Sequence, residues 1–299
     1  MGIDLDGRVA IVTGGGRGIG REHALLMASR GAKVVVNDLG IGLDATGSDP
    51  APAEQVVAEI EAAGGSAVAD GSDVTDFAQA EALVERAISK FGRLDVLVNN
   101  AGIVRDRMLV NMTIEDFETA LRVNLVGTFA PSRFAASYWR AESKAGNEVD
   151  ARIVCTSSGS GLYANVGQSN YGAAKSGVAT FAQIAAKELG RYGVTVNAIV
   201  PIANTRLTAG VDTEVVSEES PAHVAPLVCW LASRESAAVT GRIFNVAGGE
   251  ISIVESWHTG PVREKAGMWE VDELSEVIPA LVAAAPPAAD LRGRIETSA

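Results

Sequence analysis

Runs of Val, Ile, Leu and Ala recur along the chain and are separated by segments in which apolar residues lie three or four positions apart. The runs are apolar at almost every position, as is typical of parallel strands whose two faces are both covered. They predict seven strands, at Arg8–Thr13, Lys33–Asp38, Ser66–Asp70, Leu94–Asn99, Arg152–Ser157, Val194–Val200 and Arg242–Val246.

The segments between the runs predict helices. Thr113 and Asp116 predict a capping box, and Ser220 with Pro221 predicts an N-cap followed by a proline in the first turn. The alternation of strands and helices predicts an α/β fold of the Rossmann type, a doubly wound, seven-stranded parallel sheet with helices on both faces. One predicted core-facing stripe consists of Phe77, Ala80, Val84, Ala87, Ile88 and Phe91.

Residues 1–249 form one predicted domain for dinucleotide binding and catalysis, and residues 250–299 form a C-terminal extension. Within the domain, Gly40–Pro52 is rich in Gly, Pro, Asp and Ser and predicts a surface loop. The extension begins with the apolar Ile251–Val254 and predicts a helix near Val271–Ala284. It ends in prolines and polar residues, so we expect its end to be mobile.

The composition limits the function classes. The chain has 299 residues, of which 47% are hydrophobic, and a formal net charge of −12. A sizeable core is therefore expected, whereas binding to nucleic acid or to an anionic membrane surface is not. The amino terminus lacks the regions of a signal peptide, and no apolar run is long enough for membrane insertion, so the expected location is cytoplasmic.

The cysteines and histidines predict neither a reactive thiol nor a metal site. Cys155 and Cys229 lie in apolar segments and are interpreted as small buried residues. His23, His223 and His258 are widely separated and lack the spacing of metal ligands, so no metal is expected.

A glycine-rich turn, Thr13–Gly20, follows the first predicted strand. Gly14 permits the tight turn, Gly18 lets the backbone approach a ligand, and Gly20 lets the next helix pack on the strand. With a strand before it and a helix after it, the turn predicts a pyrophosphate site at the positive end of that helix. The residues of this turn expected to bind the cofactor are Gly14, Arg17, Gly18 and Ile19.

The choice of cofactor depends on two charged residues. Asp38 ends the second predicted strand, where a carboxylate accepts hydrogen bonds from the ribose hydroxyls of NAD and repels the 2′-phosphate of NADP. Arg17 favours NADP, since a basic residue in the turn can hold that phosphate. A carboxylate facing a dianion is a direct conflict, whereas Arg17 can turn to solvent, so we predict NAD, with NADP the less favoured cofactor.

Tyr171 is followed at the fourth position by Lys175 and is preceded by Ser158. Lys175 lies one helical turn on, and its positive charge is expected to lower the pKa of Tyr171 from about 10. Ser158 is expected to steady charge on a substrate oxygen. Tyr171 and Lys175 are also expected to contact the cofactor, with Lys175 bonded to the nicotinamide ribose. The three side chains predict a proton relay that accompanies hydride transfer between an alcohol or ketone and a nicotinamide cofactor.

Five motifs, in order, resemble the short-chain dehydrogenase/reductase family. They are Thr13–Gly20, Asp73-Val74, Asn99-Asn-Ala-Gly102, Asn124-Leu-Val-Gly127, and Ser158 with Tyr171 and Lys175. The resemblance implies that Asp73 and Val74 hold the adenine and that Asn100, Ala101 and Gly102 line the cofactor. It also implies that Asn124 organises a water in the proton path.

Other polar residues near these motifs have less defined roles. We expect Asn99 to tie strands together rather than to touch substrate, whereas Tyr163 and Asn165 either line the substrate pocket or pack within their loop. The chain departs from the family after Pro201, where the family usually has Gly and this chain has Ile202. Thr205 is still expected to bond the nicotinamide amide or the pyrophosphate.

A narrower resemblance is to the 3-hydroxyacyl-CoA dehydrogenase domain of the peroxisomal multifunctional β-oxidation enzyme, also called a 17β-hydroxysteroid dehydrogenase. It rests on Val35–Gly40, Gly102–Arg107, Thr205–Thr208 and Val224–Leu231. It implies an NAD-dependent enzyme that oxidises a 3-hydroxyacyl-CoA, including sterol-derived acyl groups. In that subgroup the tail forms a cover near an active site, either that of its own subunit or that of the partner subunit.

Alternative functions stay open at this stage. One is an NADPH-dependent 3-oxoacyl thioester reductase or a hydroxysteroid dehydrogenase, which cofactor preference and substrate would separate. The other is a non-catalytic dinucleotide-sensing protein, although such members commonly lose the Tyr/Lys pair that this chain retains. The resemblance also implies a homodimer or homotetramer, paired through helices at about Thr113–Lys144 and Gln168–Arg191.

Overall fold

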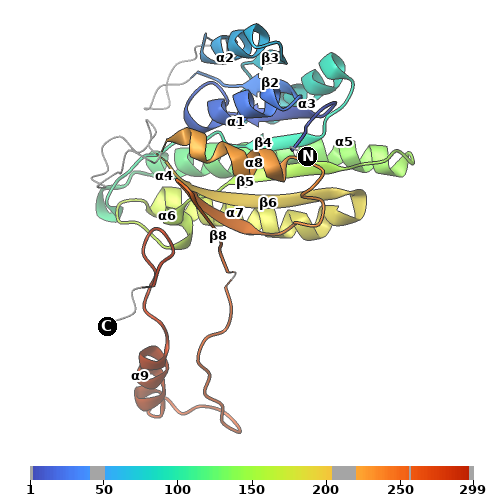
Figure 1. The fold of residues 1–299 in the computed structure, drawn as a ribbon. Coiled ribbons are helices and arrows are strands. Elements are labelled where there is room, and N and C mark those ends of the chain that lie inside the picture. The colour runs from blue at the N-terminus through green and yellow to red at the C-terminus, as the bar shows by residue number, and fades with distance from the viewer. Residues whose placement is uncertain (1–2, 41–50, 204–219, 256, 296–299) are drawn as a thin grey trace.

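The computed structural model describes residues 3–40, 51–203, 220–255 and 257–295, and its centre is one eight-stranded sheet (Figure 1). The strand order is β3-β2-β1-β4-β5-β6-β7-β8, with β8 antiparallel to β7 and the other neighbours parallel. The strands are β1 (Val9–Thr13), β2 (Lys33–Asn37), β3 (Ser66–Asp70), β4 (Val96–Asn99), β5 (Ala151–Thr156), β6 (Val194–Ile202), β7 (Ile243–Ala247) and β8 (Glu250–Ile253).

Helices cover both faces of this sheet, which is why most positions of its parallel strands are apolar. On β1, Val9 and Ile11 belong to one core cluster and Ala10 and Val12 to the other, as expected when alternate side chains of a strand point to opposite faces. One face carries α3 (Phe77–Phe91), α5 (Gly127–Lys144) and α7 (Ser169–Leu189), and the other carries α1 (Gly18–Ser29), α2 (Ala51–Ala62) and α8 (Ala225–Leu231).

The remaining helices are short or lie outside these two layers. They are α4 (Ile114–Leu121), α6 (Gly159–Leu162), α9 (Leu274–Ala284), the 3₁₀ turns Leu109–Asn111, Gly190–Tyr192 and Pro221–His223, and a π-helical turn at Arg122–Val126. Two predicted helix starts are confirmed. Thr113 Oγ1 accepts a hydrogen bond from the amide of Asp116 in a capping box, and Ser220 Oγ accepts one from the amide of Ala222.

The predicted fold class is confirmed, but three details differ. The sheet has an eighth strand, β8, which pairs with β7 across Gly248 and Gly249. Helix α2 begins at Ala51, inside the predicted loop Gly40–Pro52, of which residues 41–50 lie outside the described ranges. Phe77 at the start of α3 is 49% exposed rather than buried in the core, and its ring packs on those of Phe129 and Phe134.

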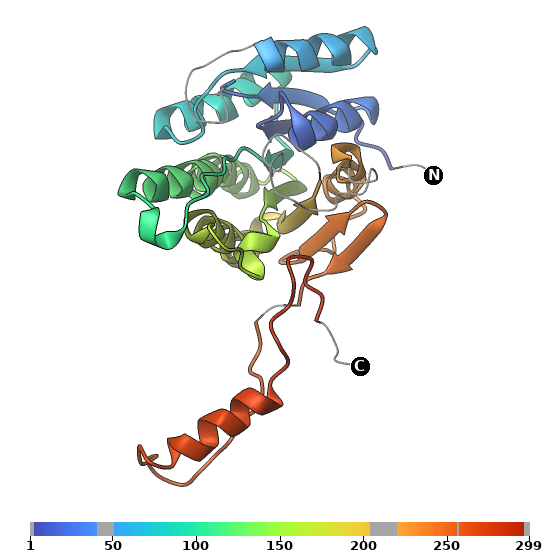
Figure 2. The same ribbon diagram turned by 90° about the vertical axis from the view of Figure 1, so that its left-hand side faces the viewer.

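The C-terminal extension leaves the sheet after β8, carries α9 away from the body and then turns back (Figures 1 and 2). No residue of α9 is buried. Residues Asp290–Ile295, hereafter the return segment, contact the body again: Arg294 pairs with Glu250 at 2.6 Å, and Asn245 Nδ2 donates to the carbonyl of Arg292 at 3.3 Å. Among the described helices, none is long and apolar enough to span a bilayer.

Candidate active site

The predicted site residues gather at the carboxyl ends of β1, β4 and β5. The strand order reverses direction between β1 and β4, and open parallel sheets bind ligands in the crevice at such a switch point. Thr13 ends β1 and Asn99 ends β4, and their extensions meet there. Thr13 Oγ1 accepts hydrogen bonds from the amides of Asn100 at 3.0 Å and Ala101 at 3.1 Å.

The glycine turn is held in shape by the loop after β4. Asn100 Nδ2 donates to the carbonyls of Thr13 and Gly14, both at 3.1 Å. Gly14 and Gly18 have φ of +61° and +52°, a region that favours glycine. A Cβ on Gly20 would overlap the Gly14 carbonyl and the Asn100 side chain. The turn therefore presents backbone amides at the start of α1, where an anion can bind.

Two other residues of the turn, Arg17 and Ile19, are also predicted to bind the cofactor. Arg17 is the N-cap of α1, with extended backbone and no capping bond from its side chain. Ile19 is partly buried and packs against the core that α1 covers. These positions are compatible with the predicted cofactor contacts, which stay a prediction.

Asp38 lies directly beside this turn. Its Oδ2 accepts a hydrogen bond from the amide of Gly16 at 2.9 Å, and its Oδ1 accepts one from the amide of Gly40 at 2.8 Å. Each carboxylate oxygen keeps a lone pair for a further donor. The carboxylate is therefore fixed at the end of β2 with the capacity to accept ribose hydroxyls.

The remaining predicted cofactor residues border the same edge of the sheet. Asp73, after β3, accepts a hydrogen bond from the amide of Thr75 at 2.8 Å, while Val74 is buried against the core. Gly102 follows β4, and a Cβ there would lie 2.6 Å from Asn124 Oδ1 and 3.4 Å from Lys175 Nζ. Thr205 lies outside the described residues.

The structure brings the predicted proton relay together. Ser158 follows β5 as the N-cap of α6, and its side chain forms a hydrogen bond with that of Tyr171. Lys175 Nζ lies 5.6 Å from the centroid of the Tyr171 ring and donates to the carbonyl of Thr156 at 2.8 Å. These three side chains lie close together because α7 packs beside the end of β5.

Asn124 lies in the π-helical turn and is completely buried. Its Nδ2 donates to the carbonyls of Ile103 and Ala120, each at 2.9 Å. Its Oδ1 accepts no hydrogen bond within the described residues, although it lies beside the Cα of Gly102 near Lys175 Nζ. A buried acceptor in this state calls for a donor such as a water, which fits the expected role.

The pKa of Tyr171 departs from the expectation of a lowered value. Burial raises it to about 12, the hydrogen bond with Ser158 lowers it, and the charge of Asp106 raises it further. Burial also lowers the pKa of Lys175 to about 8. The direction is opposite to the expected one, because the expectation counted the positive charge of Lys175 but not the removal of the phenol from water.

Three residues outside the relay have defined contacts. Asn99 Nδ2 donates to Ser132 Oγ at 2.9 Å, which links β4 to α5, and to Cys155 Sγ on β5 at 3.9 Å, which is a link between strands as predicted. Tyr163 Oη accepts from Asn245 Nδ2 at 3.2 Å, and Asn165 Nδ2 donates to Gln168 Oε1 at 3.1 Å. A place for these two side chains in a substrate pocket stays a prediction.

The sequence did not indicate that the return segment reaches this edge. Its Leu291 carbonyl lies against Gly159, and its Gly293 packs against the Tyr163 ring. Gly293 has φ of +79°, so a glycine in a polar tail was the one available signal of a specific turn. The segment therefore borders the residue that follows Ser158.

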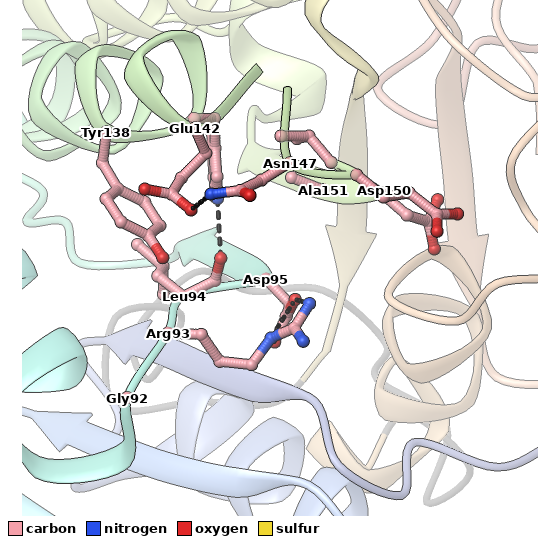
Figure 3. A pocket seen from close by; sticks show the side chains of 12 residues that line it. Gly92, Arg93, Leu94, Asp95, Tyr138, Glu142, Asn147, Asp150 and Ala151 are labelled. Atoms are coloured by element: carbon pink, nitrogen blue, oxygen red, sulfur yellow. Dashed lines mark hydrogen bonds and ion pairs between the residues drawn. The ribbon is translucent and has the colours of Figure 1, made fainter. Parts of the chain in front are cut away.

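A cavity of about 280 Å³ lies elsewhere, at the amino ends of β4 and β5 (Figure 3). Arg93, Asp95, Tyr138, Glu142 and Asp150 are among its lining residues. It is at the opposite edge of the sheet from Ser158, so it is not the site described above. Within the described ranges, no group of three His, Cys, Asp or Glu side chains is arranged to hold a metal.

Comparison with known proteins identifies related chains. The short chain dehydrogenase family matches residues 8–215. A hydroxyacyl-CoA dehydrogenase of Mycobacterium tuberculosis is 43% identical over 289 residues, covering 92% of this chain and 88% of that protein. The peroxisomal multifunctional enzyme type 2 of Drosophila melanogaster is 45% identical over 83% of this chain, which spans 40% of that enzyme.

Two solved structures are also similar. A short chain dehydrogenase from Mycobacterium avium is 53% identical with a TM-score of 0.87, covering 96% of this chain and 98% of that one. A 7α-hydroxysteroid dehydrogenase complexed with NADH and 7-oxo glycochenodeoxycholic acid is 31% identical with a TM-score of 0.72. That match covers 82% of this chain and 95% of the other.

Proposed function

Because the chain belongs to the short-chain dehydrogenase family and is an oxidoreductase acting on CH–OH groups, we propose that it oxidises 3-hydroxyacyl-CoA substrates with NAD. A nicotinamide dinucleotide is the cofactor class. The observation that carries the proposal is the meeting of Ser158, Tyr171 and Lys175 beside the glycine turn. The substrate class is supported by the name of the mycobacterial hydroxyacyl-CoA dehydrogenase and by the likeness to the multifunctional enzyme.

In the proposed mechanism, Ser158 holds the substrate hydroxyl oxygen and Tyr171 accepts its proton. When bound, the nicotinamide ring supplies the acceptor for the hydride that leaves the substrate carbon. Lys175 stabilises the phenolate form of Tyr171 through its positive charge. Asn124 Oδ1, near Lys175 Nζ, can accept a hydrogen bond from a water that carries the proton onward. Oxidation is expected to accelerate as the pH rises, because the reactive form of Tyr171 is deprotonated.

Replacing Tyr171 by Phe tests the assignment. We expect loss of turnover by about a thousandfold or more, because general base catalysis and its positioning are both removed. The dissociation constant for NADH, measured by fluorescence titration, should change little. Replacing the distant Tyr192 by Phe is the matched control. Substantial turnover by Tyr171→Phe would remove this residue from the role.

The substrate proposal is tested by a screen of 3-hydroxyacyl-CoA chain lengths and of steroid alcohols, read as NADH absorbance. Oxidation of at least one 3-hydroxyacyl-CoA is expected. Activity on steroid alcohols alone would instead support the hydroxysteroid dehydrogenase alternative.

We further propose NAD as the cofactor, because the Asp38 carboxylate is fixed at the glycine turn. The kcat/KM for NAD should exceed that for NADP. Asp38→Asn should reduce the ratio of the two kcat/KM values by about tenfold, because it removes the repulsion of the 2′-phosphate. Glu61→Gln, on the exposed side of α2, removes the same charge and should leave the ratio unchanged. Equal efficiency with NADP in the wild type would contradict the proposal and favour a 3-oxoacyl thioester reductase.

A further inference from the structure

Two buried amide side chains flank the start of α7, where Tyr171 lies in the first turn. Gln168 is 6% exposed and Asn170 is completely buried. Polar side chains are seldom buried unless their hydrogen bonds are made. The partners of these two amides therefore show what the start of the helix is attached to.

Asn170 attaches the helix to two other segments. Its Nδ2 donates to the carbonyl of Arg105 at 2.9 Å and to that of Asp116 at 3.1 Å. Its Oδ1 accepts a hydrogen bond from the backbone amide of Tyr171 at 2.7 Å. One side chain thus joins the loop after β4, the first turn of α4 and the amide of the residue proposed to exchange the proton.

Gln168 attaches the helix to a charge. Its Nε2 donates to both carboxylate oxygens of Asp106, at 3.0 and 2.9 Å, and its Oε1 accepts from Asn165 Nδ2. The backbone amide of Arg107 donates to the carbonyl of Gly167 at 2.8 Å and fixes the same loop. The carboxylate of Asp106 is therefore held against the amino end of α7.

We propose that Asn170 and Gln168 are positioning residues for Tyr171. Asn170 fixes the backbone that carries the phenol, and Gln168 holds the carboxylate of Asp106 where its charge acts on that phenol. This assignment rests on the proposed function, in which Tyr171 accepts the substrate proton. Asp106 is not a catalytic residue here, because it acts through Tyr171.

The charges around Tyr171 support a specific role for Asp106. Lys175, on the same helix, lies 5.6 Å from the Tyr171 ring centroid, and Ser158 contributes a neutral hydrogen bond. The Asp116 carboxylate of α4 is paired with Arg107 at 3.2 Å and with Arg105 at 3.6 Å. Asp106 instead accepts hydrogen bonds from a neutral amide, so its negative charge raises the pKa of Tyr171.

Asp106→Asn separates charge from geometry. The new amide oxygen can still accept from Gln168, and the position is exposed, so the fold should be retained. The acid limb of kcat/KM for oxidation should move to lower pH by about half a unit, because a nearby negative charge disfavours the phenolate. The KM for NAD should stay unchanged. An unmoved limb would overturn the role of Asp106 and Gln168.

Asn170→Ala tests whether Asn170 fixes the backbone of Tyr171, and Ser169→Ala is the matched control. Ser169 is the exposed residue between Gln168 and Asn170. For Asn170→Ala we expect kcat to fall by about ten- to a hundredfold through misplacement of the phenol, with NADH affinity unchanged. Hydrogen exchange at the Tyr171 amide should accelerate, because its acceptor is removed. Ser169→Ala should change none of these.

Two outcomes separate this proposal from the proposed function. If the wild type oxidises no secondary alcohol, the proposed function fails, and with it the catalytic purpose assigned to the two amides. If the wild type is active but Asn170→Ala keeps its kcat, or loses NADH affinity in step with kcat, the positioning role fails alone. Faster exchange at the Tyr171 amide together with an isolated loss of kcat would support it.

Discussion

At the scale of single residues, His23 stands apart from the site chemistry. It lies on α1, is completely buried, and neither ring nitrogen has a hydrogen-bond partner within the described residues. Burial lowers its pKa from 6.5 to about 3, because the charged imidazolium would be taken out of water. The folded protein therefore holds this histidine neutral at pH values where the unfolded chain protonates it.

The sign of the resulting pH dependence follows directly. Below pH 6.5 the unfolded state binds a proton that the folded state excludes, so stability falls as the pH drops toward 3. Between pH 6.5 and 5, His23 should reduce the free energy of unfolding by about 2 kcal/mol. His23→Leu should remove that part of the loss in the free energy of unfolding, as measured by urea denaturation at pH 6.5 and at pH 5. His258→Leu, at an exposed position, should keep the wild-type change in the free energy of unfolding between the two pH values. The same change in both variants would contradict the assignment.

Single residues also show which parts of the site the sequence can predict. Gly14, Asp38, Ser158, Tyr171 and Lys175 could be placed because strand ends and helical spacing bring them together. The direction of the Tyr171 pKa could not be predicted, since it depends on burial by segments distant in sequence.

The attachments of Gln168 and Asn170 were missed for a related reason. The side chain of Gln168 bonds to Asp106, and that of Asn170 bonds to the carbonyl of Arg105. Both partners lie in the loop after β4, and no local pattern encodes these contacts.

At the scale of elements, the seven parallel strands could be predicted because each is apolar on both faces. Strand β8 was missed, although Gly248-Gly249 between two short apolar runs is a hairpin signal. Its residues Ile251 and Ile253 are more than half exposed, so the burial that made the other strands recognisable is lacking there. Helix α9 was predicted from its own spacing, but its separation from the body was not.

At the scale of the whole molecule, apolar side chains remain exposed on the helices through which the family resemblance implies pairing. Val126 is 39% exposed, and Phe129 on α5 and Ile184 on α7 are 43% and 50% exposed. Phe129 stacks on Phe77 and meets Phe181 edge to face. An apolar patch rimmed by polar residues is typical of a protein interface, so we expect a homo-oligomer that uses α5 and α7.

Phe129→Glu should weaken that association, because it places a charge in an apolar contact. Molar mass measured by light scattering after size exclusion should fall toward that of one chain of 30.9 kDa. Ala58→Glu introduces the same charge on the exposed side of α2 and should leave the mass unchanged. A wild type that already elutes at the mass of a single chain would contradict the expectation.

The Thr13 hydroxyl has a consequence for heat stability. It accepts hydrogen bonds from the backbone amides of Asn100 and Ala101 across the point where the strand order reverses. The glycine turn and the loop after β4 are therefore held by one side chain, which acts as their common anchor. A dinucleotide that binds on this turn stabilises the folded state by an amount that grows with the logarithm of its concentration relative to its dissociation constant. Because the anchor joins the two halves of the sheet, we expect the dinucleotide to raise the temperature of one common unfolding transition rather than to separate it into two.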